Sequence, residues 1–90
     1  MEQTSATKEQ IRQFILESAQ RKGVTTLADD ESLSQNGVMD SLVIFRLVSF
    51  LEETFNLRVA DEEIVDENFQ SINGIEKFVE SKLAKKSDSA

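Results

Sequence analysis

The chain has 90 residues and a formal net charge of −7, and 39% of its residues are hydrophobic. This length suits one small domain, and the apolar share is enough for a single core, so global disorder is not expected. The acidic balance argues against a nucleic-acid-binding protein, which needs a basic stripe, and favours docking onto basic patches of partner proteins. The sequence has no cysteine, no long apolar run and no signal-peptide pattern at its N-terminus, which argues against secretion and a membrane span. We therefore expect a cytoplasmic monomer.

The first predicted helix follows a short polar N-terminus. Thr7 and Gln10 fit a capping box, with Thr7 at the N-cap. The apolar residues that follow at helical spacing are Ile11, Phe14, Ile15 and Ala19. Lys22 and Gly23 then predict the helix end, as a basic last turn and a left-handed glycine.

A long connection without helical periodicity runs from Val24 to Met39. The residues that can pin it to a core are Val24, Leu27, Leu33 and Val38. The residues that we expect to face water are Asp29, Asp30, Glu31, Ser32 and Ser34. Asn36-Gly37 predicts a tight turn just before the next helix. A loop of this length in a compact domain is often functional.

The second predicted helix spans about Ser41 to Phe55, with Asp40 as N-cap and Asn56 as a left-handed terminator. On a helical wheel, its core face consists of Ile44, Leu47, Val48, Leu51 and Phe55. The opposite face consists of Leu42, Arg46, Ser49 and Glu53, and the flanks hold Val43, Phe45 and Phe50. This helix is therefore apolar over more than a usual core stripe.

The last third of the chain predicts a short third helix and a longer final one. The acidic cluster of the short helix is Asp61, Glu62, Glu63, Asp66 and Glu67, with Ile64, Val65 and Phe69 between. Ser71 is the expected cap of the final helix, whose apolar residues are Ile72, Ile75, Phe78, Val79 and Leu83. Its basic C-terminal end holds Lys82, Lys85 and Lys86. The predicted fold is an all-α four-helix bundle with a long loop between helices 1 and 2. We expect one domain over residues 7–84 and flexible termini at 1–6 and 85–90.

Several chemistries are excluded by the residues. The chain has neither cysteine nor histidine, so zinc sites and Ser-His or Cys-His couples cannot form. The acidic stretches do not place oxygen ligands and glycine in the register of a calcium-binding EF-hand. Glu52 and Glu53 are adjacent in a helix and point in different directions, which does not fit paired catalytic carboxylates. We predict no metal site and no enzyme activity for the chain by itself.

Asp40-Ser41-Leu42 is the most informative tripeptide. A serine at the start of a helix lies beside unpaired backbone N–H groups and the positive end of the helix dipole, which favours a phosphate ester. The tripeptide alone favours an ordinary helix start, in which Asp40 only caps the helix and Ser41 takes its first position.

Three segments together resemble the acyl and peptidyl carrier proteins that bear 4′-phosphopantetheine. They are Gly37-Val38-Met39-Asp40-Ser41-Leu42, Leu51-Glu52-Glu53-Thr54-Phe55 and Val59-Ala60-Asp61-Glu62-Glu63, within a similarity over about Lys8 to Leu83. The resemblance implies that Ser41, flanked by Asp40 and Leu42, receives 4′-phosphopantetheine from coenzyme A. It also implies a surface for partner enzymes, for which we expect Leu42, Arg46, Ser49, Glu52, Glu53, Glu62 and Glu63. Those partners would be a phosphopantetheinyl transferase, an acyl- or aminoacyl-loading ligase and downstream transfer enzymes.

Departures from fatty-acid-synthase carriers point to a more specialised member of that family. Val43 and Arg46 stand where such carriers usually have acidic residues, and Ala60 replaces a common proline. The segment between Asp61 and Ile72 is slightly longer, which resembles D-alanyl carriers and stand-alone carriers of specialised pathways. We also expect the rings of Phe45, Phe50, Phe55 and Phe69 to fill the interior. A short or polar cargo that stays exposed on its arm would fit such a core.

Two functions remain open from the sequence. The first is a stand-alone carrier that holds an acyl or aminoacyl thioester on a Ser41-linked arm and moves it between biosynthetic enzymes. The second is an unmodified helical interaction module that uses only its acidic face.

Overall fold

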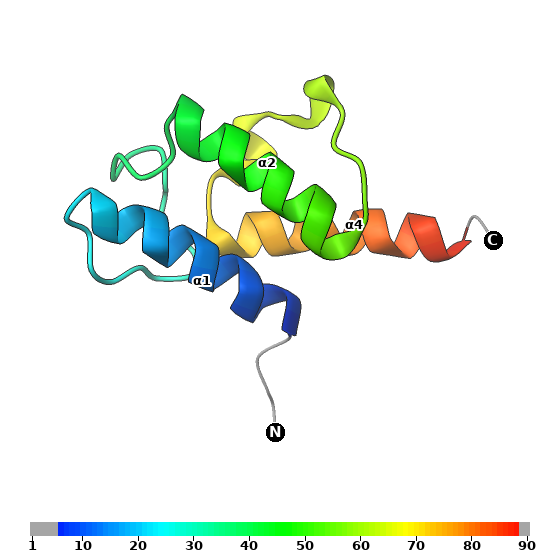
Figure 1. Cartoon of the computed structure of the whole chain (residues 1–90), viewed down its shortest axis with the longest axis horizontal. Helices are drawn as coiled ribbons and strands as arrows, with labels where there is room; N and C mark the ends of the chain where they lie inside the picture. The colour runs from blue at the N-terminus through cyan, green and yellow to red at the C-terminus, as the bar shows by residue number, and fades with distance from the viewer. Residues whose placement is uncertain (1–5, 89–90) are drawn as a thin grey trace.

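The computed structural model describes residues 6–88 (Figure 1). Over these residues the chain forms α1 (Ala6–Arg21), α2 (Ser41–Phe55), a short 3-10 helix η1 (Asp61–Glu63), α3 (Asp66–Phe69) and α4 (Ile72–Asp88), with no strand. The predicted all-α fold with a long loop after the first helix is confirmed. Residues 1–5 and 89–90, part of the predicted flexible termini, lie outside the described residues, and α4 continues past 84 to Asp88. The domain bounds remain a prediction.

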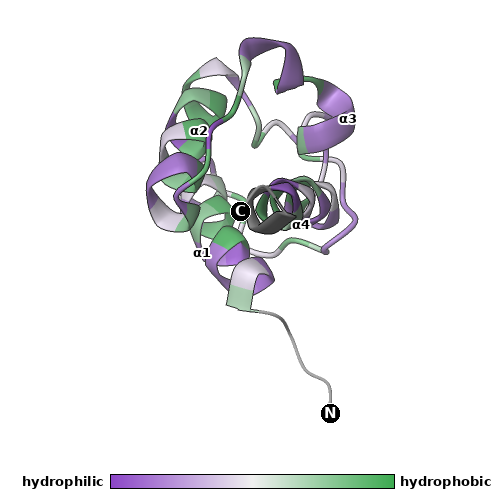
Figure 2. Cartoon of the chain, turned by 90° about the vertical axis from the view of Figure 1, so that its right-hand side faces the viewer, coloured by the Kyte–Doolittle hydropathy of each residue, from purple (hydrophilic) through white to green (hydrophobic). Residues whose placement is uncertain are grey.

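Helix α4 lies at the centre of the arrangement, because α1, α2 and α3 all pack against it. Figure 2 looks almost along α4, with α1 and α2 on one side and α3 on the other. The side chains that meet there are apolar and almost fully buried, namely Ile11, Ile15, Ala19, Leu47, Leu51, Phe69, Ile72, Ile75, Phe78 and Val79. Removing this apolar surface from water is the main stabilising contribution to the fold.

Helix α1 starts one residue earlier than its predicted cap. It begins at Ala6, so Thr7 lies inside the first turn and the N-cap prediction for Thr7 is wrong. Alanine is the strongest helix former, which is consistent with the helix including Ala6. The predicted end is confirmed, because Gly23 adopts a left-handed conformation with φ of 85°. The amide of Val24 there donates to the Ala19 carbonyl at 2.9 Å.

The α1–α2 loop is pinned to the core as predicted. Leu33 and Val38 are fully buried, and Val24 and Leu27 pack against the core from its edge. The prediction that Asp29 faces water is wrong, because its carboxylate is half-buried and accepts a 2.5 Å hydrogen bond from Arg12. This hydrogen bond holds the pKa of Asp29 below its ordinary value. The Asp29 carbonyl also accepts from the Asn73 amide at 2.9 Å, which ties the loop to α4.

Two other polar residues of the loop also differ from the prediction. Glu31 and Ser32 are half-buried, and the Glu31 carboxylate accepts hydrogen bonds from the Asn36 side chain at 2.8 Å and from the Ala28 amide at 3.0 Å. These hydrogen bonds lower the pKa of Glu31, and the bond from Asn36 has the larger effect. The Glu31 carboxylate therefore joins two parts of the loop to each other.

The buried face of α2 is rotated relative to the predicted one. Val43, Leu47 and Leu51 are buried, whereas Ile44, Val48 and Phe55 are only half-buried. These three buried residues, spaced four apart, form one stripe along the helix, hereafter the buried stripe. Val43 was expected on the flank, and its burial turns the neighbouring residues of α2 toward water.

The predicted short third helix is divided in two. η1 and α3 are separated by Ile64 and Val65, and Val65 has the backbone angles of an extended residue. Helix α4 begins as predicted, because the buried Ser71 accepts a 3.0 Å hydrogen bond from the Gly74 amide with its hydroxyl. Ser71 is therefore the N-cap of α4.

Truncation of the buried stripe is expected to destabilise the fold. Leu47→Ala removes a fully buried side chain and leaves a cavity, so the free energy of unfolding should fall by about 2–5 kcal/mol. Urea denaturation followed by circular dichroism measures this change. Ser49→Ala on the exposed face of α2 is the matched control and should stay within about 0.5 kcal/mol of the parent chain. Equal stability of the two variants would contradict the packing described.

Candidate functional site

The start of α2 has the geometry of a capped helix. Asp40 has extended backbone angles, and its Oδ1 accepts a 2.9 Å hydrogen bond from the Val43 amide. The predicted N-cap role of Asp40 is confirmed. Ser41 is the first residue of the helix, and its side chain is exposed. The most informative serine of the sequence therefore lies in solvent at the positive end of a long helix.

The preceding loop fixes the position of this helix start. Gly37 has a φ of 83°, a left-handed conformation that glycine adopts without strain. The Val38 amide donates to the Asn36 side chain at 3.1 Å, and the Met39 amide donates to the Leu33 carbonyl at 2.9 Å. The predicted Asn36-Gly37 turn is confirmed, and the buried Val38 anchors it to the core.

A basic side chain that sequence reasoning did not assign to the site lies next to Asp40. The Lys22 ammonium, from the turn after α1, forms an ion pair with the Asp40 carboxylate. The hydrogen bond from Lys22, followed by that from the Val43 amide, holds the pKa of Asp40 below its ordinary value. The local pattern assigned Lys22 only to the end of the first helix, because Lys22 and Asp40 are 18 positions apart.

The Ser41 hydroxyl has no internal activator. Over residues 6–88 no hydrogen bond to this hydroxyl is found, and the chain contains no histidine. Ser41 is therefore not set up as a nucleophile in its own right. The positive end of the α2 dipole instead favours an anionic group attached there.

The predicted partner-binding residues fall into two groups. Leu42, Arg46, Ser49 and Glu53 are all exposed on one side of α2, as the wheel predicted, and Glu62 is exposed in η1. Glu52 and Glu63 instead hold the segment between α2 and α4 in place. The Glu52 carboxylate accepts the Val59 amide at 2.9 Å.

Glu63 makes the stronger internal attachment. Its carboxylate forms an ion pair with Lys82 of α4 at 2.8 Å and accepts the Ala60 amide at 2.9 Å. These contacts, Lys82 first, lower the pKa of Glu63. This part of the acidic cluster therefore stabilises the connection from η1 to α4.

Phe45 contradicts the expectation of an interior ring. Its side chain is 70% exposed, and the neighbouring Leu42 is 58% exposed. Phe45 stands two positions from both Val43 and Leu47, which corresponds to about 200° around the helix. Burial of those two residues therefore turns Phe45 toward solvent, and sequence reasoning missed it as a surface residue.

The other phenylalanine rings pack as predicted. Phe14 of α1 stacks on Phe50 of α2 with ring centroids 4.7 Å apart, and Phe50 meets Phe55 edge-on at 6.3 Å. Phe69 and Phe78 pack edge-on at 5.4 Å between α3 and α4. Such aromatic pairs fill the interfaces between helices.

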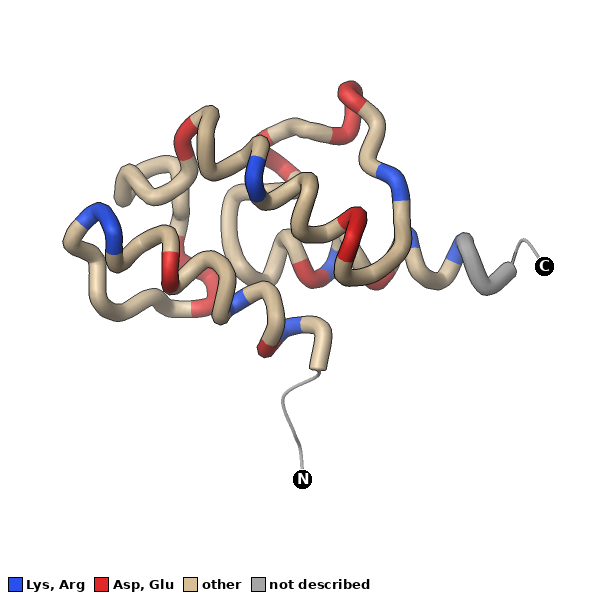
Figure 3. Tube along the Cα trace, in the orientation of Figure 1, with Lys and Arg blue, Asp and Glu red and all other residues tan. Residues whose placement is uncertain are grey.

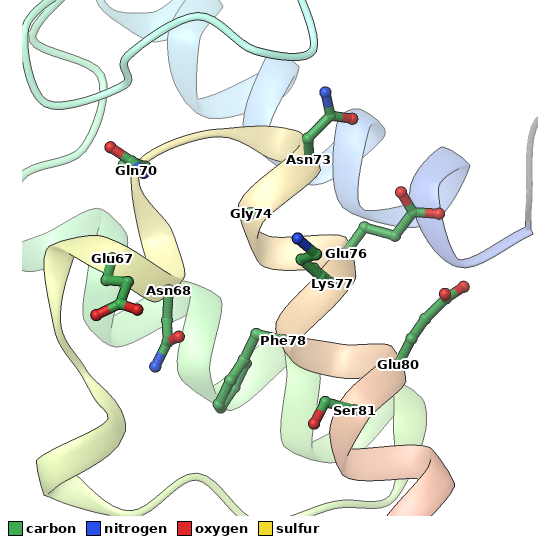
Figure 4. Close-up of a pocket in the computed structure, with 10 residues that line it drawn as sticks. All are labelled: Glu67, Asn68, Gln70, Asn73, Gly74, Glu76, Lys77, Phe78, Glu80 and Ser81. Carbon is green, nitrogen blue, oxygen red and sulfur yellow. The ribbon is translucent and has the colours of Figure 1, made fainter.

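A surface hollow of about 680 Å³ lies along α3 and α4. Phe78 projects toward it from α4 and Asn68 faces it from α3, while most of the other lining residues are polar or charged (Figure 4). Neither Ser41 nor any other α2 residue lines it. The hollow is therefore separate from the site at the start of α2.

Two further findings concern the described part of the chain. Within residues 6–88, no three acidic side chains come together as a possible metal site. Across the same residues, none of the helices combines the length and apolarity needed to traverse a bilayer.

Comparison with known families gives the decisive observation. Residues 9–79 match the model of a family described as the phosphopantetheine attachment site. The chain belongs to this family. No curated protein matches the chain significantly.

Membership makes the chain a non-catalytic carrier to which 4′-phosphopantetheine is attached covalently. Carriers of this family interact with a phosphopantetheinyl transferase and with pathway enzymes. An exposed serine hydroxyl at a helix N-terminus fits an attached phosphodiester, because the positive end of the helix dipole favours its negative charge. The unmodified interaction module is correspondingly disfavoured.

The ion pair at the helix start predicts a pH response of this carrier domain. Because Asp40 has a lower pKa in the folded chain than in the unfolded chain, its charged form stabilises the fold near neutral pH. That contribution is lost as the pH falls through the folded pKa. In Lys22→Gln, the Asp40 pKa should rise toward its ordinary value of 3.8 yet stay below it, since the Val43 amide still donates.

Carboxyl NMR titration of Asp40 measures this shift. The control is Arg21→Gln, which removes the adjacent exposed charge at the end of α1. An unchanged Asp40 pKa in Lys22→Gln, or an equal rise in both variants, would argue against the specific ion pair.

Proposed function

We propose that Ser41 is the residue that carries 4′-phosphopantetheine. The observation that carries this proposal is the exposed Ser41 hydroxyl at the first position of α2, directly after the N-cap Asp40. In the transfer, the Ser41 oxygen forms a bond to the phosphorus of coenzyme A that carries the pantetheine group. The P–O bond between this phosphorus and the phosphate on the adenosine side breaks. Adenosine 3′,5′-bisphosphate leaves, and a base of the transferase takes the hydroxyl proton.

The attached group supplies the chemistry that the chain lacks. It brings a thiol to a sequence without cysteine, and that thiol holds an acyl or aminoacyl cargo as a thioester. The protein then moves the cargo from a loading ligase to downstream transfer enzymes. Ser41 fixes the base of the arm at the start of α2, and the positive end of the helix dipole offsets part of the negative charge of the phosphodiester.

We further propose a dedicated biosynthetic pathway instead of the general fatty acid synthase. From Ser41 to Leu51 the only charged residue of α2 is Arg46. The fatty-acid-synthase carriers that the sequence resembles usually have acidic residues in this stretch. The segment from Asp61 to Ile72, which contains η1 and α3, is slightly longer than in fatty-acid-synthase carriers, and in this respect the sequence resembles D-alanyl carriers and stand-alone carriers of specialised pathways. A cytoplasmic, monomeric, stand-alone carrier is the corresponding proposal.

The cargo is proposed to be short or polar and to remain largely exposed. Support comes from two ring pairs that join different helices, Phe14 with Phe50 between α1 and α2 and Phe69 with Phe78 between α3 and α4. Phe55 packs edge-on against Phe50 within α2. A long acyl chain would have to separate such pairs to enter the interior, at a cost in packing. Phe45 no longer belongs to this argument, since it is exposed.

Modification of Ser41 can be tested by intact mass. Incubation of the full chain with a phosphopantetheinyl transferase and coenzyme A should add one phosphopantetheine group, and Ser41→Ala should abolish the addition. The helical circular dichroism should stay near that of the parent chain, because Asp40 still caps α2. Ser81→Ala, at an exposed serine of α4, is the control and should be modified fully. A mass increase in Ser41→Ala would refute the assignment, and none in the parent chain would favour the unmodified module.

The cargo proposal can be tested on the arm-bearing protein. Short-chain and long-chain acyl forms should both leave the methyl NMR shifts of Leu47, Leu51 and Val79 close to those of the unloaded form. The thioester should also be hydrolysed at similar rates in both forms. Large core shifts together with a protected thioester in the long-chain form would show that the chain is buried.

A further inference from the structure

The chain contains the dipeptide Asn-Gly twice, in two different backbone settings. Asn36-Gly37 lies in the turn before α2, and Asn73-Gly74 lies in the first turn of α4. Asparagine is a thermolabile residue. Its side-chain amide is most reactive when glycine follows, because glycine has no Cβ to hinder attack by its own backbone nitrogen. The two sites therefore allow one reaction to be compared at two places in the same fold.

The Asn36 side chain is folded over the Gly37 peptide unit. Its Oδ1 accepts a 3.1 Å hydrogen bond from the Val38 amide, two residues further on. This hydrogen bond closes an Asx turn, a ring that contains both the Asn36 Cγ and the Gly37 nitrogen. The same donor stabilises the negative charge that develops on Oδ1 when the nitrogen attacks Cγ. The turn thus brings the two reacting groups together.

The Gly37 amide is weakly held and open to solvent. It donates to the Ser34 carbonyl at 3.3 Å, which is a long hydrogen bond. Gly37 is exposed, and outside its chain neighbours no heavy atom lies within 4 Å of the position that a Cβ would occupy. Solvent hydroxide can therefore reach the amide proton, whose removal makes the nitrogen a nucleophile.

Asn73-Gly74 is the opposite case. The Gly74 amide donates to the Ser71 hydroxyl at 3.0 Å as part of the α4 cap. A Cβ at Gly74 would lie 3.3 Å from this hydroxyl oxygen and 3.5 Å from the Asn68 carbonyl oxygen, so the space around it is closed. Attack by the Gly74 nitrogen requires the first turn of α4 to open, which costs free energy.

We propose that Asn36 deamidates spontaneously in the folded protein, whereas Asn73 is protected. The Gly37 nitrogen, having lost its proton to hydroxide, forms a bond to the Asn36 Cγ, and the Cγ–Nδ2 bond breaks. The leaving nitrogen takes a proton from water and departs as ammonia. Water then opens the cyclic imide at either of its carbonyls, which leaves aspartate or isoaspartate. In isoaspartate the main chain runs through the side chain and is longer by a methylene group.

Deamidation removes a contact that holds the loop. The Asn36 Nδ2 donates to the Glu31 carboxylate at 2.8 Å. In the product a carboxylate oxygen replaces this donor, so two negative charges face each other, which is unfavourable. Figure 3 shows acidic positions in the α1–α2 loop and just before α2, so the new charge joins a region that is already acidic. The loop that positions the start of α2 therefore loosens as the chain ages.

The reaction is tested on the full chain with no enzyme added. Folded protein and protein unfolded in guanidinium chloride are incubated in parallel in mildly alkaline buffer, and peptide mapping by mass spectrometry follows both asparagines. In the unfolded chain the two sites should react at similar rates, because the same dipeptide is then solvated. In the folded chain Asn36 should react within about twofold of its unfolded rate or faster. Asn73 should be slowed about fivefold or more, the factor to which one hydrogen bond corresponds.

Two results would overturn the proposal. The first is a rate for Asn36 in the folded chain that lies below this limit. The second is reaction of Asn73 as fast as that of Asn36 in the folded chain.

Substitutions test the consequence for the loop. Asn36→Asp imitates the aspartate product and should raise the exchange rate of the Met39 amide, which donates to the Leu33 carbonyl, about fivefold or more. Adding Glu31→Gln should restore slow exchange, because the new amide can donate to the carboxylate at position 36. The control Asn73→Asp introduces the same charge in the first turn of α4, where the helix dipole favours it, and should leave Met39 exchange within about twofold of the parent chain.

The loop variants also have outcomes that contradict the inference. Unchanged Met39 exchange in Asn36→Asp would show that the contact with Glu31 does not hold the loop. Fast exchange that persists after Glu31→Gln is added would show that charge repulsion is not the cause. None of these outcomes bears on the carrier role of Ser41, which is tested separately by its modification.

Discussion

The burial of Val43, Leu47 and Leu51 determines which side chains of α2 are exposed near Ser41. These residues are spaced four apart and form the buried stripe of α2. A helix with one stripe in the core has its other positions fixed by geometry, 100° per residue. Leu42, Phe45 and Arg46 are exposed for this reason. The side chains presented beside Ser41 are thus a direct consequence of which face of α2 is buried.

The position of the helix start depends on a second set of contacts, made by residues far apart in the sequence. Leu33 and Val38 anchor the long loop in the core, and Lys22 meets Asp40 from the turn after α1. Farther along, Glu63 is held by Lys82 of α4. Each exposed ion pair contributes little stability on its own. Together with the buried anchors, they place an otherwise irregular loop so that Asp40 can cap α2.

Local patterns predicted the helix ends well, whereas side-chain exposure required the tertiary structure. Asp40, Asn56 and Ser71 act within three or four residues of themselves, so their capping chemistry is visible in the sequence. The pairs Lys22–Asp40 and Lys82–Glu63 join positions 18 and 19 apart, for which the sequence carries no local signal. A helical wheel orders residues by angle but does not give the rotation of the helix against its neighbours. For that reason Val43 and Phe45, both placed on the flank, ended on opposite sides of α2.

The long loop also links the start of α2 to the corner between α3 and α4. The Leu33 amide donates to the Gln70 carbonyl at 2.8 Å, while the Leu33 carbonyl accepts the Met39 amide at 2.9 Å. The buried Leu33 is thus hydrogen-bonded both to the segment just before Ser41 and to the residue that follows α3. Contiguous hydrogen bonds of this kind open as a cooperative unit during local unfolding. Amide exchange at Leu33 and Met39 would consequently report on the opening of the α3–α4 corner from a loop distant from it in sequence.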